Sequence, residues 1–193
     1  MKQGFFPDMV YGQLYMEYKL PEGTDSKKVL KDLQEIESYL KTREEITHVT
    51  TSIGGTPGRY NLVRSIANPS LAYGELIIDF TSPDALEDNM DAIQTYLTAQ
   101  YPDAYVKLKR YNLMFKKYPI EAQFLGPDPA VLHRLADSAR IIMERTPEVC
   151  LITTDWNPDV PVLTVEYDQP IARALGLSRN DVSISLLTAT GGI

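Results

Sequence analysis

Residues 13–20, Gln13-Leu14-Tyr15-Met16-Glu17-Tyr18-Lys19-Leu20, alternate between two sets of side chains. The even positions are apolar or aromatic, and the odd positions are mostly polar or charged. Because successive side chains of a β-strand point to opposite faces, this alternation predicts a strand with one face against a core. Pro21-Glu22-Gly23 then turns the chain, and apolar residues at helical spacing predict a helix from about Ser26 to Arg43.

The remainder of the first half continues with strands and one further helix. Strands are expected near Ile46–Ile53 and Leu71–Phe80, separated by a glycine-rich loop. Ser82 is a good N-cap with Pro83 at the first helical position, and the last strand runs from about Ala104 to Leu113. The order β-α-β-β-α-β is the split βαβ arrangement of ferredoxin-like folds.

The second half repeats this order without its last element. The expected elements are strands at Pro119–Leu125, Val149–Thr154 and Val162–Tyr167, a helix capped at Asp128-Pro129, a short turn at Pro170–Leu175, and a second helix launched by Ser178–Asp181. We therefore predict an α+β protein with two ferredoxin-like units. The first spans residues 1–116 and is complete, and the second spans residues 117–193 and lacks its closing strand.

Composition and charge exclude several classes of function. The chain has 193 residues, 44% of them hydrophobic, so it can bury a core and wholesale disorder is not expected. A net charge of −7 argues against nucleic acid, because binding phosphates requires a basic surface. No apolar run approaches the roughly 20 residues of a membrane-spanning helix, and no signal peptide is visible. Cys150 is the single cysteine, so no internal disulfide is possible.

No sequence pattern indicates catalysis, a cofactor or a metal. The glycine-rich loop Gly54–Arg59 lacks the Lys-Ser/Thr pair of a phosphate-binding loop. His48 and His133 lie far apart without cysteine partners, and no nucleophile elbow is present. We therefore expect neither an enzyme nor a bound cofactor or metal.

The sheet face away from the predicted helices carries aromatic rings interleaved with charges. Tyr15 and Glu17 lie on this face of the first strand, and Lys109 and Tyr111 on that of the last strand. The first and last strands are neighbours in a ferredoxin-like sheet, so these side chains would share one surface. Such a surface can bind an amphipathic ligand or can simply be a solvated sheet face, and the pattern leaves both interpretations open.

Several short motifs, taken in order and spacing, resemble resistance-nodulation-division (RND) multidrug efflux pumps, the acriflavine-resistance type of inner-membrane transporter. The motifs are Phe5-Phe6-Pro7-Asp8, Leu20-Pro21-Glu22-Gly23-Thr24, Pro119-Ile120-Glu121-Ala122, Gly126-Pro127-Asp128, Thr154-Asp155-Trp156, and the stretch from Asp168 to Val182. The resemblance covers almost the whole chain. It implies the two porter subdomains of the second half of such a pump, with a docking insertion after Leu187–Gly192 that would precede the missing strand.

The resemblance also implies a function and a set of residues for it. The segments would flank a cleft through which small amphipathic or hydrophobic substrates pass, in the periplasmic portion of a bacterial inner-membrane protein. The full pump would be a proton-driven homotrimer working with a periplasmic adaptor and an outer-membrane channel. The implied switch loop contains Gly54, Gly55, Pro57 and Gly58, and the implied substrate pathway contains Tyr15, Glu17, Thr56, Arg59, Lys109, Tyr111 and Leu113.

This sequence departs from the drug-pump pattern in the cleft itself. Glu17, Lys107 and Lys109 make the expected cleft more polar and charged than the usual Phe and Met lining. The alternative function is a free-standing ferredoxin-like module that binds or senses a small ligand, and it would need a completed second unit.

Overall fold

The computed structural model describes residues 9–58, 60–64, 66–112, 118, 120–156 and 159–191. The chain divides into two compact units, Met1–Pro158 and Asp159–Ile193. The predicted subdomain boundary between residues 116 and 117 stays a prediction.

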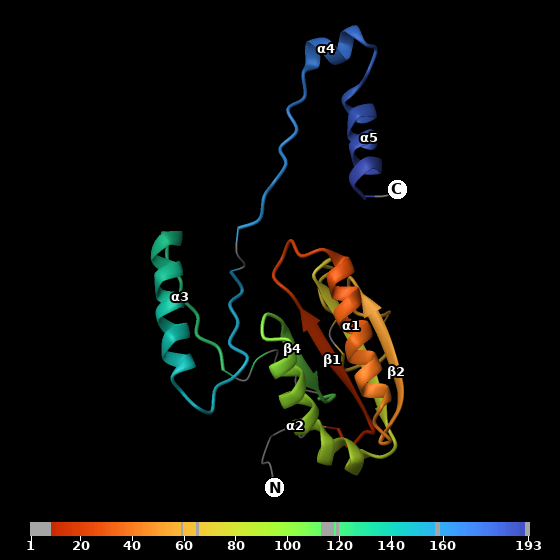
Figure 1. Ribbon diagram of the computed structural model, residues 1–193. Coiled ribbons are helices and arrows are strands. Elements are labelled where there is room, and N and C mark those ends of the chain that lie inside the picture. The colour runs from red at the N-terminus through yellow and green to blue at the C-terminus, as the bar shows by residue number, and fades with distance from the viewer. Residues whose placement is uncertain are drawn as a thin grey trace. The chain divides into compact units, whose positions relative to one another are not determined.

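The first unit is built on a four-stranded sheet (Figure 1). Its strands are β1 (Gln13–Lys19), β2 (Ile46–Ile53), β3 (Tyr73–Phe80) and β4 (Tyr105–Lys109), in the spatial order β2-β3-β1-β4. Every neighbouring pair is antiparallel. This order, together with the two intervening helices, is the predicted ferredoxin-like arrangement.

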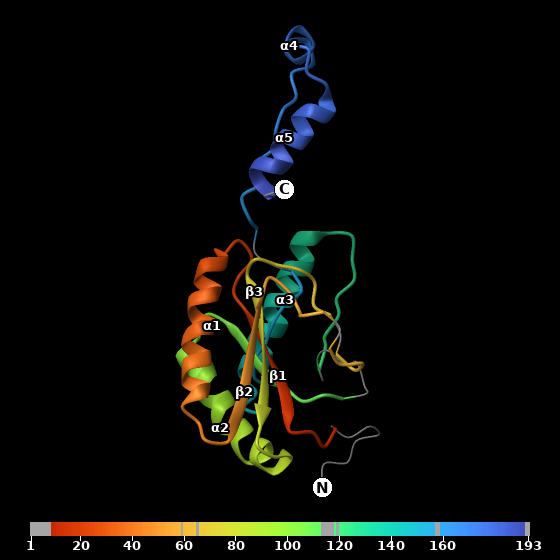
Figure 2. The ribbon, with the colours of Figure 1, turned by 90° about the vertical axis from the view of Figure 1, so that its right-hand side faces the viewer.

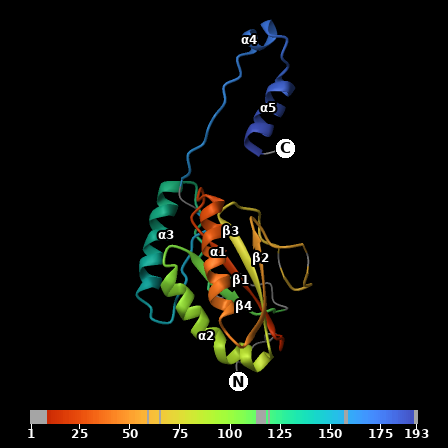
Figure 3. The same cartoon turned by 45° about the vertical axis from the view of Figure 1, so that its right-hand side comes forward.

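Two helices cover one face of the sheet, and the opposite face, which neither of them covers, is called the helix-free face. They are α1 (Ser26–Lys41) and α2 (Pro83–Gln100), and Figures 2 and 3 show both on the same side of the strands. As predicted, Ser82 caps α2, since its side chain accepts a hydrogen bond from the Ala85 amide at 3.1 Å. Pro83 occupies the first turn of α2, where its missing N–H leaves no hydrogen bond unmade.

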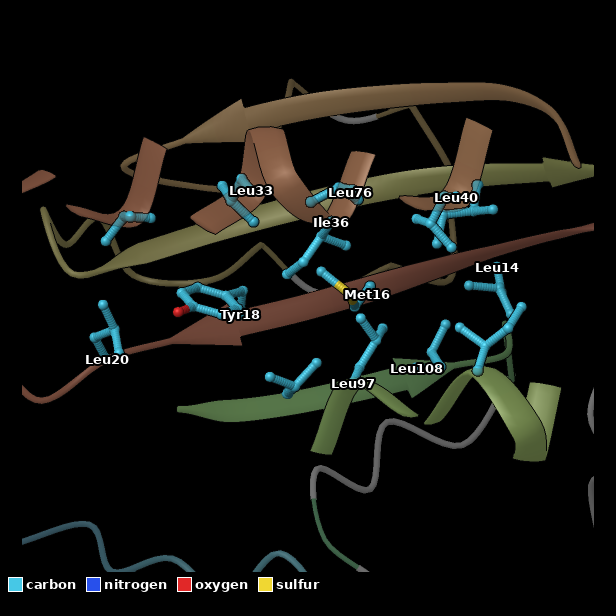
Figure 4. Packing of buried hydrophobic residues seen from close by; sticks show 14 of the residues in the cluster. Leu14, Met16, Tyr18, Leu20, Leu33, Ile36, Leu40, Leu76, Leu97 and Leu108 are labelled. Atoms are coloured by element: carbon cyan, nitrogen blue, oxygen red, sulfur yellow. The ribbon is translucent and has the colours of Figure 1, made fainter. Parts of the chain in front are cut away.

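The core lies between this helix layer and the sheet (Figure 4). The alternation of β1 supplies it with the fully buried side chains of Leu14, Met16 and Tyr18. Facing residues include Leu33, Ile36 and Leu40 of α1, Leu76 of β3, Leu97 of α2 and Leu108 of β4. Because even positions of β1 face the core, odd positions must face the opposite, helix-free side.

In the described part of the second half, the only regular secondary structure is helical. The helices are α3 (Pro129–Glu144), α4 (Gln169–Ala174) and α5 (Arg179–Gly191). Asp128 caps α3, as predicted from the Asp-Pro pair. The capping box is also confirmed, because the Ser178 amide donates to Asp181 Oδ2 at 2.8 Å and the Asp181 amide donates to Ser178 Oγ at 3.2 Å.

The prediction of three strands in the second half is wrong for the described residues. No strand is assigned in 120–125, 149–154 or 162–167. A helix satisfies its backbone hydrogen bonds within one segment, whereas a strand needs a neighbouring strand. The sequence pattern identified segments able to become strands, but the pairings that would make them a sheet are not formed. Among the described helices, none combines the length and apolar character needed to cross a membrane.

Candidate functional site

The helix-free sheet face brings two carboxylates into direct opposition. Glu17 of β1 pairs in register with Glu75 of β3, so both side chains lie on the same face of adjacent strands. The Glu75 side chain is fully buried, and that of Glu17 is 13% exposed. Like charges directly opposite each other destabilise a sheet, and a buried carboxylate requires a partner. This register therefore requires a cation between the two strands.

Arg64 supplies that cation from the segment that connects β2 to β3. Its side chain is only 5% exposed. The Nη2 atom lies 2.6 Å from Glu75 Oε2 and 3.1 Å from Glu17 Oε1, and Nε donates to Glu75 Oε1 at 3.3 Å. The guanidinium carbon also lies 4.2 Å from the ring centroid of Tyr15, a cation–π distance. One side chain therefore contacts both carboxylates and stacks on an aromatic ring.

Three hydroxyl groups complete the shell of the buried Glu75. Tyr73 donates to Oε2 at 2.7 Å, Thr56 to Oε2 at 3.0 Å, and Tyr60 to Oε1 at 3.1 Å. Burial, reinforced by the neighbouring carboxylate, raises the pKa of Tyr73 well above its usual range. Burial alone would lower the pKa of Arg64, but the hydrogen bonds and charge of Glu75 raise it instead. The guanidinium is therefore permanently charged.

The network continues from Glu17 toward the edge strand β4. Glu17 Oε2 accepts from Lys109 Nζ at 2.6 Å, so this carboxylate bridges Lys109 and Arg64. Tyr111 is also buried, and its ring centroid lies 5.4 Å from that of Tyr15. Burial is the main cause that raises the pKa of Tyr111, and likewise that of Tyr15, to about 12.

The group around the guanidinium is named the Arg64 cluster. It comprises Tyr15, Glu17, Thr56, Tyr60, Arg64, Tyr73, Glu75 and Lys109. Its members come from β1, β3, β4 and the connection after β2.

The glycine loop at residues 54–58 is hydrogen-bonded to β3 beside the Arg64 cluster. Gly54 has φ +80°, a backbone region that favours glycine, and its amide donates to the Tyr73 carbonyl at 2.8 Å. Its carbonyl accepts from the Ser70 amide at 3.0 Å. Two residues on, Thr56 contacts Glu75 and also accepts from the Ala67 amide at 2.9 Å. The loop therefore closes on itself and on β3 at the same time.

The structure brings together most of the residues that the sequence singled out. Tyr15, Glu17, Thr56, Lys109 and Tyr111 converge on the helix-free face. Gly54, Gly55, Pro57 and Gly58 lie in the loop beside them, while Arg59 and Leu113 lie outside the described residues. The role of all these residues in a substrate pathway stays a prediction.

Sequence reasoning missed the centre of the site. Arg64, Glu75, Tyr60 and Tyr73 were not selected, although Glu75 accepts hydrogen bonds from the other three. The available signal was Glu75 itself, a charge in the middle of the apolar strand segment 71–80. A carboxylate at a buried strand position implies a cationic partner elsewhere in the chain.

The chemistry of the cluster suits binding rather than bond breaking. In the part of the chain that the structure describes, no group of three or more His, Cys, Asp or Glu side chains is placed to hold a metal ion. The cluster offers two carboxylates, three hydroxyls and an aromatic ring around one planar cation. Such a set recognises charge and shape.

Comparison with known proteins gives one family and two informative structures. The family model described as "AcrB/AcrD/AcrF family" matches residues 1–193. The chain is similar to a heavy metal efflux pump solved in two crystal forms. For form II, the identity is 18% and the TM-score 0.62, over 94% of this chain and 20% of the pump. For form I, the identity is 16% and the TM-score 0.60, over 95% of this chain and 20% of the pump.

These structural likenesses show a shared fold. The chain spans about a fifth of the length of the solved pumps that it matches. A comparison with curated proteins gives no match.

Proposed function

The chain belongs to the AcrB/AcrD/AcrF family, and from that premise we propose that it lines part of the substrate entrance cleft and translocation pathway of a proton-driven RND efflux transporter. The resemblance seen in the motifs covers almost the whole chain, and the family model matches residues 1–193. In this proposal the chain is a periplasmic porter portion of a bacterial inner-membrane protein. Energy comes from proton flux through membrane helices elsewhere in the transporter.

The observation that carries the proposal is the convergence of polar and aromatic side chains on the helix-free sheet face. Apolar residues of similar volume are often at least as stabilising as a buried ion pair. Stability alone therefore gives little reason to keep Arg64, Glu17 and Glu75 at 5%, 13% and 0% exposure. A surface that combines charges with aromatic rings is suited to small amphipathic substrates.

The donor atoms favour organic substrates over metal ions. The two solved structures compared above are both of a heavy metal efflux pump. Soft thiolate and thioether ligands are the ones that bind soft metal ions such as Cu(I). The Arg64 cluster presents carboxylates, hydroxyls and aromatic rings instead. We therefore assign this face to small amphipathic or hydrophobic organic molecules.

The partners of the transporter follow from the same premise. As an RND pump it would work as a homotrimer with a periplasmic adaptor and an outer-membrane channel. The chain itself would contribute binding and passage and no bond-breaking step.

A matched pair of variants tests this proposal in cells. The transporter that contains this chain is deleted and restored as wild type, Glu17→Gln or Glu35→Gln, and accumulation of ethidium and Nile red is followed by fluorescence. Glu17 bridges two cations in the cluster, whereas Glu35 lies on the outer face of α1, 55% exposed and 3.9 Å from Lys31. We expect Glu17→Gln to change export of at least one dye by about fivefold, corresponding to about 1 kcal/mol of binding.

The control variant should export both dyes as the wild type does. Equal export by all three proteins, at equal amounts in the membrane, would contradict a role for this face in the substrate pathway.

A further inference from the structure

We propose that the space filled by the Arg64 guanidinium is a binding site for planar organic cations, namely guanidinium and amidinium headgroups, and that Arg64 is its built-in occupant. The inference rests on the proposed function, since it names the substrate class of the same sheet face. It follows from the geometry of the guanidinium, from the charge that remains without it, and from its aromatic neighbour.

The side chains around the Arg64 guanidinium contact it on several sides, as a binding cage surrounds a ligand. Nε and Nη2 face the two oxygens of Glu75 at 3.3 and 2.6 Å, which is the side-on, two-point pairing of a planar fork with a carboxylate. Nη2 also reaches the Tyr73 hydroxyl at 3.2 Å and Thr56 Oγ1 at 3.4 Å. A compact ammonium group cannot reproduce two parallel contacts to one carboxylate.

The walls of the cage carry a net negative charge once the guanidinium is set aside. Glu17 and Glu75 contribute two negative charges and Lys109 one positive charge, which leaves one negative charge. Lys109 contacts Glu17 Oε2, whereas the guanidinium contacts Oε1. The lysine therefore does not occupy the position of the guanidinium, and a cation is the species that this space attracts.

The Tyr15 ring gives the cage a flat wall. The guanidinium carbon lies 4.2 Å from its centroid. Planar guanidinium and amidinium groups stack on aromatic faces, and the ring quadrupole attracts a cation more strongly than a neutral group and repels an anion. Shape and charge thus select the same class of ligand.

Arg64 itself regulates access to this cage. A side chain tethered beside its site acts at an effective concentration in the millimolar range or above. A free cation therefore binds weakly while the Arg64 guanidinium is in place, and binds well when the guanidinium has left. Transport of a guanidinium compound would require this exchange.

Removal of the occupant and replacement by a free molecule tests the inference. Arg64→Ala deletes the atoms that N-ethylguanidinium restores, and N-ethylurea has the same shape without the charge. Thermal unfolding of the 193-residue chain is followed by the near-ultraviolet circular dichroism of its tyrosines, with each compound at concentrations up to about 50 mM. We expect N-ethylguanidinium to raise the Tm of Arg64→Ala by about 5 °C, in a saturable manner, through preferential binding to the folded state.

The controls separate binding in the cage from general solvent effects. The wild type should show no saturable rise, and N-ethylurea should leave Arg64→Ala unchanged. The double variant Arg64→Ala, Glu75→Gln should bind N-ethylguanidinium roughly tenfold more weakly, because its main carboxylate partner is neutral. If Arg64→Ala does not fold, the same titration is read as ligand-driven recovery of the tyrosine signal.

Equal effects of the cation and the urea, or an equal rise in the wild type, would overturn the inference. So would the absence of any saturable effect on Arg64→Ala. The thermal-unfolding titration measures binding alone and does not depend on whether the transporter exports a substrate. If N-ethylguanidinium does not stabilise Arg64→Ala but Glu17→Gln changes dye export as expected, only the cation cage is overturned. If N-ethylguanidinium stabilises Arg64→Ala but Glu17→Gln exports both dyes as the wild type does, only the proposed function is overturned.

Discussion

Breaking the Arg64–Glu75 pair from one side should destabilise the sheet far more than removing both partners. Arg64→Met retains an unbranched stem but deletes the charge. Glu75, which is fully buried, would then keep only its three hydroxyl donors. Removal of one partner of a buried ion pair costs about 3–5 kcal/mol. Because the hydroxyls still solvate the carboxylate, we expect the lower end, about 3 kcal/mol.

The second half of the experiment is the partner substitution. Glu75→Leu leaves Arg64 with the Glu17 contact at 3.1 Å, and it should also cost about 3 kcal/mol. The double variant removes both charges and should lie within about 1 kcal/mol of the wild type, because apolar residues commonly replace buried ion pairs without loss. The coupling between the two sites is then about 5 kcal/mol.

Urea unfolding monitored by near-ultraviolet circular dichroism measures these differences, since several tyrosines surround the pair. A loss below about 1 kcal/mol for Arg64→Met would match an exposed ion pair. That result, or simple additivity of the two single substitutions, would refute the placement of a buried guanidinium between the strands.

Two further predictions concern the framework that holds the site. A Cβ at Gly74 would lie 2.3 Å from Leu33 Cδ1, so Gly74→Ala should cost about 1–3 kcal/mol in urea unfolding and much less in a Leu33→Ala background; the same cost in both backgrounds would contradict this packing. The hydrogen bond from Lys41, followed by that from Thr51, holds the pKa of Glu37 below its usual 4.5. Its contribution to stability is therefore present at neutral pH and lost as the pH falls through the lowered pKa. Wild type and Glu37→Gln should differ by less than about 1 kcal/mol at pH 7 and converge near pH 3, whereas a difference that grows in acid would reverse the assigned shift.

The fold of residues 1–116 could be predicted because the sequence patterns that specify its elements are local and strong. The alternation of residues 13–20 and the Ser82-Pro83 cap each determine an element without reference to distant residues. Every strand expected in residues 1–116 forms, within four residues of its predicted ends. The face that carries Tyr15 and Glu17 then follows from the period of two.

In the second half, local sequence patterns predict the helices but not whether strands form. The caps at Asp128 and Ser178 predict their helices correctly, since a cap acts within one turn. The segments 120–125, 149–154 and 162–167 have strand-like composition, but a strand exists only when another strand pairs with it. Composition carries no information about that partner.

The centre of the site could not be predicted for a related reason. Arg64 lies in an irregular connection with no periodicity, so nothing local indicates that its side chain is 5% exposed. Its position follows from the register that sets Glu17 against Glu75, and register belongs to the assembled sheet. Glu75, a charge within the apolar segment 71–80, indicates that a cationic partner exists but not which residue it is.

Labelling of single cysteines in the complete transporter tests the central claim most directly. In a cysteine-free background of the transporter that includes Cys150→Ser, Lys109→Cys places a thiol at the cluster and Lys31→Cys places one on the outer face of α1. The rate of maleimide labelling is measured in membranes with and without an exported dye. The account predicts that the dye slows labelling at position 109 and leaves position 31 unchanged. Equal rates with and without dye at both positions would contradict a substrate pathway along the helix-free sheet face.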